Sequence, residues 1–446
     1  MIYVLFRSLL IYLLWGLFPV FLFSQGDFHL QKGKEKEVVR FDFINNLMIV
    51  PIEVNGVELS FIVDTGVNKP ILFNLSENDS VSLRNFEEIT IKGLGDGEAI
   101  QAIKSSGNTF RIGEIYNPNQ EIYILMDTDI NLSPRLGIAV NGIIGYDLFE
   151  NFVVEVNYNR ARLEFHRPDT YTYRNCRKCE THQMDIVANK PFIKGFIDLN
   201  ESQDLPVYLL VDTGSTDALW LFEDEKQGIN VPEKYFDDYI GRGLSGDVYG
   251  KRSRVRSFAI GDFELEQAKV AFPDSASTQN LKYLGTRNGS VGNEIIKRFN
   301  LVFDYPNRKI TLRKNRFFND PFKYNMSGIE LQHNGLRLVR EISGSFNHLR
   351  NKDENSQGIT FDLQRNYSIE LHPALEIAEL RENSPAKEVG LRKGDVILSV
   401  NGTPVHRFSI QELREILNEK PGKKLKLRIQ RDGKELQFAF QLKKVL

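Results

Sequence analysis

One motif occurs twice in the sequence, and this duplication is the strongest constraint on the fold. Segment 61–66 reads FIVDTG and segment 209–214 reads LLVDTG. Segments 141–145 (NGIIG) and 288–292 (NGSVG) follow in the same order, and in each copy the last glycine lies 80 or 81 residues after the aspartate. Landmarks that recur in register predict two homologous lobes.

The local patterns within each copy are typical of strands. Short segments rich in Val, Ile and Phe are separated by turn residues such as Asn55-Gly56. The segments are Ile49–Val54, Glu58–Val63, Phe152–Val156, Leu163–His166, Phe192–Leu199, Val207–Val211, Leu301–Phe303 and Ile310–Leu312. We therefore expect a mainly β fold, with lobes at 37–168 and 183–318 joined by a polar connector at 169–182.

Charge and length narrow the class of protein. The 446 residues include 57 basic and 59 acidic ones, for a net charge of -2. This balance gives no electrostatic footprint for nucleic acid. A chain of this length also exceeds one ordinary core, so two to four folding units are expected.

The N-terminus predicts export. Residues 1–24 contain one charge, Arg7, then an apolar run, then a small residue at Ser24. This is the pattern of a secretory signal peptide, with cleavage near Ser24. The alternative is an uncleaved anchor, for which the apolar run is barely long enough.

Both cysteines lie in the connector, as Cys176 and Cys179, with His182 nearby. Three local side chains give poor geometry for zinc, so we predict no metal site. In an exported protein the pair is either a local disulfide or two exposed thiols that stiffen the connector.

Paired Asp-Thr-Gly turns predict chemistry that a lone copy would not. Peptide hydrolysis needs a base to activate water and an acid for the leaving group, and two adjacent carboxyls, Asp64 and Asp212, supply both. Like charges so close cannot both ionise, so one proton is shared. A glycosidase arrangement is disfavoured, because it needs more room between its carboxyls.

The neighbouring residues have predicted roles in the same site. Thr65 and Thr213 are placed to hydrogen-bond across a pseudo-twofold axis, and Gly66 and Gly214 allow amides to approach the carboxylates. Stretches 92–98 and 241–250 are predicted hairpin tips that close over a substrate. The residues expected at these tips are Gly93, Gly95, Gly97, Gly243, Gly246 and Tyr249.

These motifs resemble the pepsin and retropepsin aspartic proteases, in particular bacterial two-lobed retropepsin-like members with a C-terminal PDZ domain. The resemblance covers about residues 37–446. It implies a catalytic dyad of Asp64 and Asp212, no cofactor and no need for a partner subunit. Ser215 conforms to the family and is placed to hydrogen-bond Asp212. Val67 and Ser290 depart from the family pattern.

The C-terminal part, 322–446, carries a second resemblance. Segment 379–402 contains SPA, GL and GDVI in the order typical of a PDZ domain, with a signature core at 374–442. Ser384 and Pro385 predict the start of a short helix, and Ser409–Asn418 predicts an amphipathic one. Asp432-Gly433 predicts a hairpin turn, and the polar segment Asn347–Gln357 predicts a solvated insertion.

A PDZ domain adds an extended peptide to a sheet edge and captures its carboxylate on backbone amides. By the resemblance, the loop that precedes the signature stretch would do this, namely Met326, Ser327, Gly328 and Ile329. The alternative is a domain that only packs against the protease lobes.

The sequence therefore predicts an exported aspartic endopeptidase that acts on protein or peptide substrates, with peptide C-termini as PDZ ligands. The alternative, motivated by Val67 and Ser290, is a catalytically impaired peptide-binding protein that keeps the fold.

Overall fold

The computed structural model describes residues 26–75, 81–95, 97–126, 130–199, 204–278, 287–349 and 360–446. The expected signal peptide lies outside these residues. Among the residues that are described, no helix is both long and apolar enough to span a membrane.

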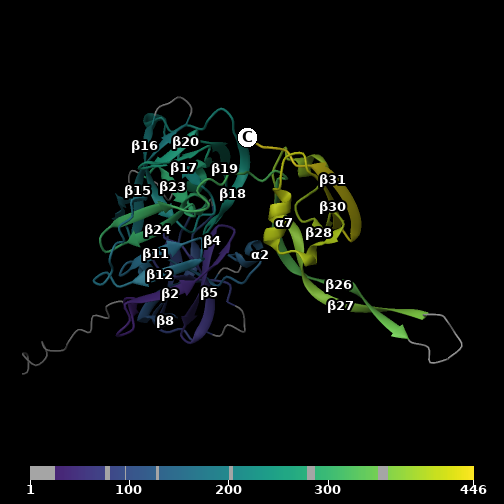
Figure 1. The fold of residues 1–446 in the computed structure, drawn as a ribbon, viewed down its shortest axis with the longest axis horizontal. Coiled ribbons are helices and arrows are strands. Elements are labelled where there is room, and N and C mark those ends of the chain that lie inside the picture. Colours follow the sequence, from purple (N-terminus) through teal and green to yellow (C-terminus); the bar gives the residue numbers. More distant parts are fainter. Residues whose placement is uncertain are drawn as a thin grey trace, which may run out of the picture.

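The first lobe is a nine-stranded sheet in the order β1-β9-β6-β10-β5-β4-β8-β7, with β3 paired to β4 (Figure 1). Two one-turn helices, α2 (Ser133–Leu136) and α3 (Tyr146–Phe149), flank β10 in the sequence. The strands are β1 (His29–Leu30), β3 (Asp42–Ile44), β4 (Leu47–Val54), β5 (Val57–Val63), β6 (Ile71–Leu72), β7 (Phe86–Ile91), β8 (Ile100–Ile112), β9 (Ile115–Leu125) and β10 (Gly142–Ile144).

The second lobe repeats this plan with ten strands in the order β18-β19-β22-β17-β23-β16-β15-β20-β21, and β14 paired to β15. The elements are β14 (Asp185–Val187), β15 (Lys190–Asp198), β16 (Leu205–Asp212), β17 (Leu219–Leu221), η1 (Glu225–Gln227), β18 (Phe236–Gly243), β19 (Gly246–Arg254), β20 (Ser257–Ile260), β21 (Phe263–Glu266), β22 (Lys269–Pro273), α4 (Ser275–Thr278), β23 (Gly289–Gly292) and α5 (Asn293–Ile296).

A six-stranded sheet, β13-β25-β24-β11-β12-β2, joins the two lobes. Its central pair is antiparallel and crosses the lobe boundary, with Val154 opposite Phe303. One buried apolar cluster runs from Phe28 to Phe322, so the lobes share a core that begins before the expected start at residue 37. The strands are β2 (Lys36–Arg40), β11 (Val153–Asn157), β12 (Arg162–His166), β13 (Cys179–Gln183), β24 (Phe299–Asp304) and β25 (Lys309–Lys314).

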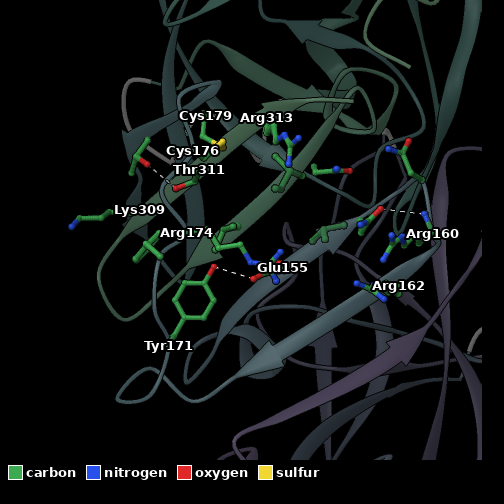
Figure 2. A pocket seen from close by; sticks show the side chains of 18 residues that line it. Glu155, Arg160, Arg162, Tyr171, Arg174, Cys176, Cys179, Lys309, Thr311 and Arg313 are labelled. Atoms are coloured by element: carbon green, nitrogen blue, oxygen red, sulfur yellow. Dashed lines mark hydrogen bonds between the residues drawn. A yellow bond between two sulfur atoms is a disulfide. The ribbon is translucent and has the colours of Figure 1, made fainter. Parts of the chain in front are cut away.

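The connector crosses the outer side of this sheet between β12 and β13 (Figure 2). Cys176 and Cys179 form a disulfide in it, which is one of the two alternatives that the sequence left open. The amide of Cys179 also donates to the main-chain oxygen of Cys176 at 3.2 Å. The turn that starts β13 is therefore held by both a covalent bond and a hydrogen bond.

The C-terminal domain has its own core, which runs from Met326 to Leu442. The predicted amphipathic helix is α7, where Ser409 and Glu412 form a capping box, and the predicted hairpin at Asp432-Gly433 joins β30 to β31. The elements are β26 (Ile329–Leu349), β27 (Thr360–Leu380), α6 (Pro385–Glu388), β28 (Val396–Val400), β29 (Thr403–Pro404), η3 (Val405–Arg407), α7 (Ile410–Leu417), β30 (Lys424–Arg431) and β31 (Lys434–Gln441).

The first three residues of the polar segment expected as an insertion, 347–349, end one strand of a long two-stranded arm. β26 and β27 have 21 residues each and stay paired up to Leu349 and Thr360. Figure 1 shows the arm projecting away from both the C-terminal domain and the lobes. Residues 347–349 are thus strand rather than loop, whereas residues 350–357 lie outside the described ones, so the insertion as a whole stays a prediction.

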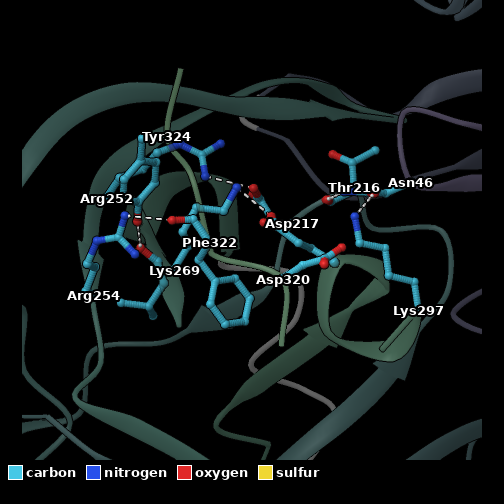
Figure 3. Close-up of polar contacts among 12 residues, drawn as sticks. Asn46, Thr216, Asp217, Arg252, Arg254, Lys269, Lys297, Asp320, Phe322 and Tyr324 are labelled. Carbon is cyan, nitrogen blue, oxygen red and sulfur yellow. Dashed lines mark hydrogen bonds and ion pairs between the residues drawn. The ribbon is translucent and has the colours of Figure 1, made fainter. Parts of the chain in front are cut away.

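A buried polar network in the second lobe fixes the chain that leads to the C-terminal domain (Figure 3). Arg252 contacts Asp217 at 2.8 Å and Asp238 at 3.0 Å. Burial alone would raise the pKa of Asp217, but Arg252 and Lys269 lower it below its ordinary value. The hydroxyl of Tyr324 donates to the main chain of this lobe, so the linker is bound where it passes.

Candidate active site

The two aspartates stand at equivalent places in the duplicated lobes. Asp64 directly follows β5 and Asp212 ends β16. β5 lies between antiparallel β4 and parallel β10, and β16 lies between antiparallel β15 and parallel β23. Each aspartate therefore projects from the end of a strand that is fixed on both sides.

Two buried threonines connect the aspartate turns. The amide of Thr65 donates to Oγ1 of Thr213 at 3.0 Å, and the amide of Thr213 donates to Oγ1 of Thr65 at 3.1 Å. Their hydroxyls donate onward to the main-chain oxygens of Val211 at 2.5 Å and Val63 at 2.8 Å. The hydrogen bonding that the sequence predicted across the lobes is thus reciprocal and fully buried.

The glycines of the motif bring main chain against the carboxylates. The amide of Gly66 donates to Oδ1 of Asp64 at 2.7 Å, and that of Gly214 donates to Oδ1 of Asp212 at 3.0 Å. A Cβ atom at position 214 would lie 2.2 Å from Cγ of Asp64, in the other lobe. The two turns interleave so closely that no side chain fits at position 214.

The environment separates the protonation behaviour of the two carboxyls. Burial and the charge of Asp212 raise the pKa of Asp64. Burial also raises the pKa of Asp212, but Arg287 and Lys190 oppose this rise. Lys190 lowers the pKa of both carboxyls, so Arg287 makes the difference: it favours the carboxylate form of Asp212 and leaves the proton to Asp64.

Sequence reasoning missed these two cations. Burial lowers the pKa of Arg287 to about 10, and Nε of Arg287 donates to the main-chain oxygen of Gly289 at 2.8 Å. Arg287 directly precedes the second NG element, where the first copy has Val140. A comparison of the two copies position by position was the available signal. Lys190, at the start of β15, gave no such signal.

Two asparagines, also missed, hold the lobes together beside the dyad. Nδ2 of Asn293 donates to the main-chain oxygens of Asn46 at 2.6 Å and Thr213 at 3.1 Å. Nδ2 of Asn46 donates to the main-chain oxygen of Thr216 at 2.8 Å. Asn293 follows the second hydrophobic-Gly element directly, but only the tertiary structure brings it to residue 46.

The residues that depart from the family pattern occupy regular positions. The amide of Val67 donates to the main-chain oxygen of Asp64 at 3.2 Å. The amide of Ser215, which conforms to the family, makes the equivalent bond to the main-chain oxygen of Asp212 at 3.3 Å. Ser290 is buried in β23, where it pairs with strands on both sides. Neither departure disrupts the main chain around the dyad.

The two glycine-rich stretches are at hairpin tips, and the tips contact each other. The amide of Gly97 donates to the main-chain oxygen of Ser245 at 2.6 Å. The amide of Ser245 donates to the main-chain oxygen of Leu94 at 2.9 Å. The amide of Gly93 donates to Oγ of Ser245 at 2.9 Å. We call β7–β8 and β18–β19, with these tips, the flap hairpins. They are linked across the lobe boundary.

Each flap tip also packs one leucine side chain against the opposite lobe. Leu94 of the first lobe packs with Ile240 and Val248 of the second, whereas Leu244 of the second lobe packs with the outer cluster of the first. The main chains of the two tips lie too close together for a side chain at Gly243, because a Cβ atom there would lie 2.0 Å from the main-chain oxygen of Leu94. Gly95 and Gly246 have positive φ angles of 125° and 121°.

Tyr249 lies below the tip of its flap hairpin. It pairs with Tyr239 across β18 and β19, and its side chain is 44% exposed. Both tyrosines line a cavity of about 300 Å³ that the second lobe shares with the C-terminal domain. The other lining residues are Asp237, Asp238, Gly250, Asp274, Asn325, Gly328, Glu330, Glu379, Leu380, Arg381 and Glu382.

The loop at 326–329 has its amides engaged within its own domain. Oδ1 of Asn325 accepts from the amides of Ser327 at 3.1 Å and Gly328 at 3.0 Å. The amide of Met326 donates to Asn418 at 3.0 Å, and that of Ile329 donates to Oγ of Ser327 at 3.1 Å. A carboxylate would have to replace these acceptors to bind here.

Helix α2 of the first lobe lies against the edge strand β26 and helix α7. Nε2 of Gln411 donates to the main-chain oxygen of Leu136 at 2.8 Å, and Arg414 donates to that of Arg135 at 2.7 Å. A Cβ atom at Gly137 would lie 2.7 Å from Ile410. Among the described strands β26 pairs only with β27, so its other edge is open. Helix α2 lies beside that open edge (Figure 1).

The flap contact predicts a difference between two glycines of one strand. Gly243→Ala should separate the tips, because its Cβ atom meets Leu94, whereas Gly241→Ala should not, because nothing lies within 4 Å of a Cβ atom there. Hydrogen exchange of the Gly97 and Ser245 amides measures this, with faster exchange expected only in Gly243→Ala. Equal protection in both variants would contradict a closed flap contact.

Two family models match segments of this chain. A family described as aspartyl protease matches residues 50–148 and 198–291, one segment in each lobe, and a family described as PDZ domain matches residues 376–431. The structure is similar to the aspartic proteinase from Irpex lacteus, with 14% identity and a TM-score of 0.39, over 64% of this chain and 99% of that one.

The curated relatives match a short region only. They include the periplasmic serine endoprotease DegP of Salmonella typhimurium, 43% identical over 65 residues, 15% of this chain and 13% of the relative. The pH-dependent serine endoprotease DegQ of Escherichia coli is 32% identical over 82 residues, 18% of each chain. This chain thus spans less than a fifth of these relatives, within their PDZ region. The two lobes of this chain thus match an aspartyl protease family, and its C-terminal domain matches a PDZ domain family.

Proposed function

We propose that the protein is an aspartic endopeptidase in which Asp64 and Asp212 act on one water molecule. The observation that carries the proposal is the pair of buried carboxyls at interleaved turns, where Arg287 favours the carboxylate of Asp212 and the charge of Asp212 raises the pKa of Asp64. Asp212, favoured as carboxylate by Arg287 and Lys190, takes a proton from water as the oxygen attacks the peptide carbon. Asp64 donates its proton to the carbonyl oxygen. Collapse of the tetrahedral intermediate then transfers a proton to the departing amine.

The flap hairpins give this proposal a substrate path. An extended peptide would lie between the dyad and the tips, which must part for it to enter and can close over it afterwards. Closure excludes water and strengthens the electrostatic interactions on which the dyad depends. The competing function is peptide binding without cleavage by a protein that keeps the same fold. Cleavage by the wild type and by variants of the two aspartates distinguishes this function from catalysis.

Replacement of either dyad carboxyl should abolish cleavage. We expect Asp64→Asn and Asp212→Asn to lower peptide-library cleavage by residues 25–446 at least about a hundredfold, because each removes a proton-transfer group. Asp262→Asn, at an exposed carboxyl, is the matched control. Circular dichroism verifies folding. A silent wild type, or dyad variants that still cleave, would favour the peptide-binding alternative.

The pH dependence should follow the two carboxyls. Because Asp64 must be protonated and its pKa is raised, activity should persist above the ordinary carboxyl range and fall as pH rises through that raised pKa. Arg287→Gln should move the acid limb of kcat/KM to higher pH, because Asp212 loses a cation that favours its carboxylate. Arg287→Lys, which keeps the charge, should stay close to wild type. An unmoved acid limb in Arg287→Gln would contradict the assignment.

Export belongs to the same proposal. The named relatives of the PDZ region are periplasmic proteins, and the N-terminal pattern is that of a signal peptide. We propose that the protein acts outside the cytoplasm, on protein or peptide substrates.

We further propose that the PDZ domain binds peptide C-termini only when α2 withdraws. The open edge of β26 is where a peptide strand would add, and α2 lies there, held by Gln411 and Arg414. In the closed arrangement the domain packs against the first lobe, so packing and recognition are alternative states of one surface.

Loosening α2 should therefore improve peptide binding. The double variant Gln411→Ala, Arg414→Ala removes two hydrogen bonds to α2, each worth about 1 kcal/mol, so binding should tighten about tenfold or more. The probe is a fluorescein-labelled decapeptide with a free hydrophobic C-terminus, followed by anisotropy, with its amide as negative control. Glu415→Ala, on the exposed side of α7, is the matched variant. Equal or absent binding in all three proteins would contradict this gating.

A further inference from the structure

A large cavity lies on the side of the interlobe sheet that faces away from the core. It has a volume of about 630 Å³, within the range of small-molecule sites (Figure 2). Val154 of β11 is fully buried in the core, and the next residue, Glu155, faces the cavity, as expected from the alternation of a strand. As far as the structure describes them, the dyad, the flap tips and the PDZ domain contribute no residue to its lining.

Positive charge dominates the lining. Among the described lining residues Glu155 is the single acidic one, and it already accepts a hydrogen bond from Tyr171 at 3.1 Å. Arg162 pairs with Glu164 at 2.5 Å, but for the other four cations the described part of the chain supplies no ion pair. Five cationic side chains and one acidic one of the described residues thus line the cavity, whereas the whole chain has a net charge of -2. The cationic lining residues are Arg160, Arg162, Arg174, Lys309 and Arg313.

The wall also contains hydrogen-bonding capacity that the chain does not use. Oδ1 of Asn159, Oδ1 of Asn300 and Nε of Arg162 are buried, and none has a partner among the described residues. Buried polar atoms are almost always paired, so such a group points to a bound water or ligand. The cavity therefore lacks both hydrogen-bond donors for the amide oxygens and acceptors for the guanidinium.

The connector makes the rim rigid. The Tyr173 hydroxyl donates to Asp304 at 2.5 Å, and the rings of Tyr171 and Tyr173 meet edge to face at 5.0 Å. The disulfide between Cys176 and Cys179 closes the same rim. A site held by a covalent bond and paired aromatic rings is largely formed before a ligand arrives, which lowers the cost of binding.

We propose that this cavity binds a saccharide that carries phosphate or sulfate groups. The unpaired cations match several anionic groups, and arginine binds such groups through paired N–H donors. The unused amide oxygens of Asn159 and Asn300 require donors, which sugar hydroxyls supply and an inorganic sulfate ion lacks. The volume exceeds what one inorganic anion fills. This inference is independent of the proposed peptidase function.

Titration calorimetry on residues 25–446 tests the proposal. Sucrose octasulfate and glucose 6-phosphate represent the small sulfated and phosphorylated sources, heparin represents a sulfated polymer, and sucrose and inorganic sulfate are controls. We expect binding of at least one anionic saccharide, and none of sucrose. Sulfate at the same concentration that binds equally well, or no saccharide binding at all, would overturn the proposal.

Variants locate the site. Arg174→Gln and Arg313→Gln should each weaken saccharide binding about tenfold, since each removes a charged hydrogen-bond donor. Arg428→Gln, which removes an exposed arginine of the PDZ domain, is matched in charge and should leave affinity unchanged. Cys176→Ser should weaken binding by freeing the rim. Equal affinity in Arg174→Gln and Arg428→Gln, or tighter binding of a poly-glutamate peptide than of any saccharide, would contradict the assignment.

Discussion

The reciprocal hydrogen bonds between Thr65 and Thr213 determine where the two aspartates lie. These residues are 148 positions apart in the chain, and each threonine both donates to and accepts from the opposite turn in a fully buried setting. Two carboxyls at close range repel when ionised, so they cannot hold themselves together. Main-chain donors and acceptors, which would be left unpaired if the lobes separated, supply that force instead.

A second connection forms where the flap tips meet. Leu94 and Leu244 each pack into the opposite lobe, and glycines on both sides allow the backbones to touch. The lobes are therefore joined at the aspartate turns, at the flaps and through the shared sheet. Among the described residues, the flap connection rests on a few main-chain hydrogen bonds, one to a side chain, and two leucines. A connection made by so few contacts is the one whose opening should cost the least.

The sequence was sufficient to predict features that repeat or that are local. The duplicated motif predicted the lobes, alternation predicted the strands, and Ser409 with Glu412 predicted the start of α7. It was insufficient for contacts between distant segments, such as Asn46 with Asn293, because neither residue has a local pattern that indicates its partner. The long β26–β27 arm was missed because strand prediction relies on a buried face, and Leu338 and Leu371 in this arm are more than 60% exposed.

The position of α2 connects the PDZ domain to the dyad through few elements. α2 is followed by β10, and β10 pairs in parallel with β5, which ends next to Asp64. Asn141, between them, holds the amide of Ser60 in β5 through its side chain at 3.1 Å. The withdrawal of α2 that we propose for peptide binding would therefore act on a strand that pairs beside the Asp64 turn. In a closely packed core such a shift would be felt by the neighbouring strands. The proposed PDZ groove and the Asp64 turn are thus separated by one short segment of the first lobe.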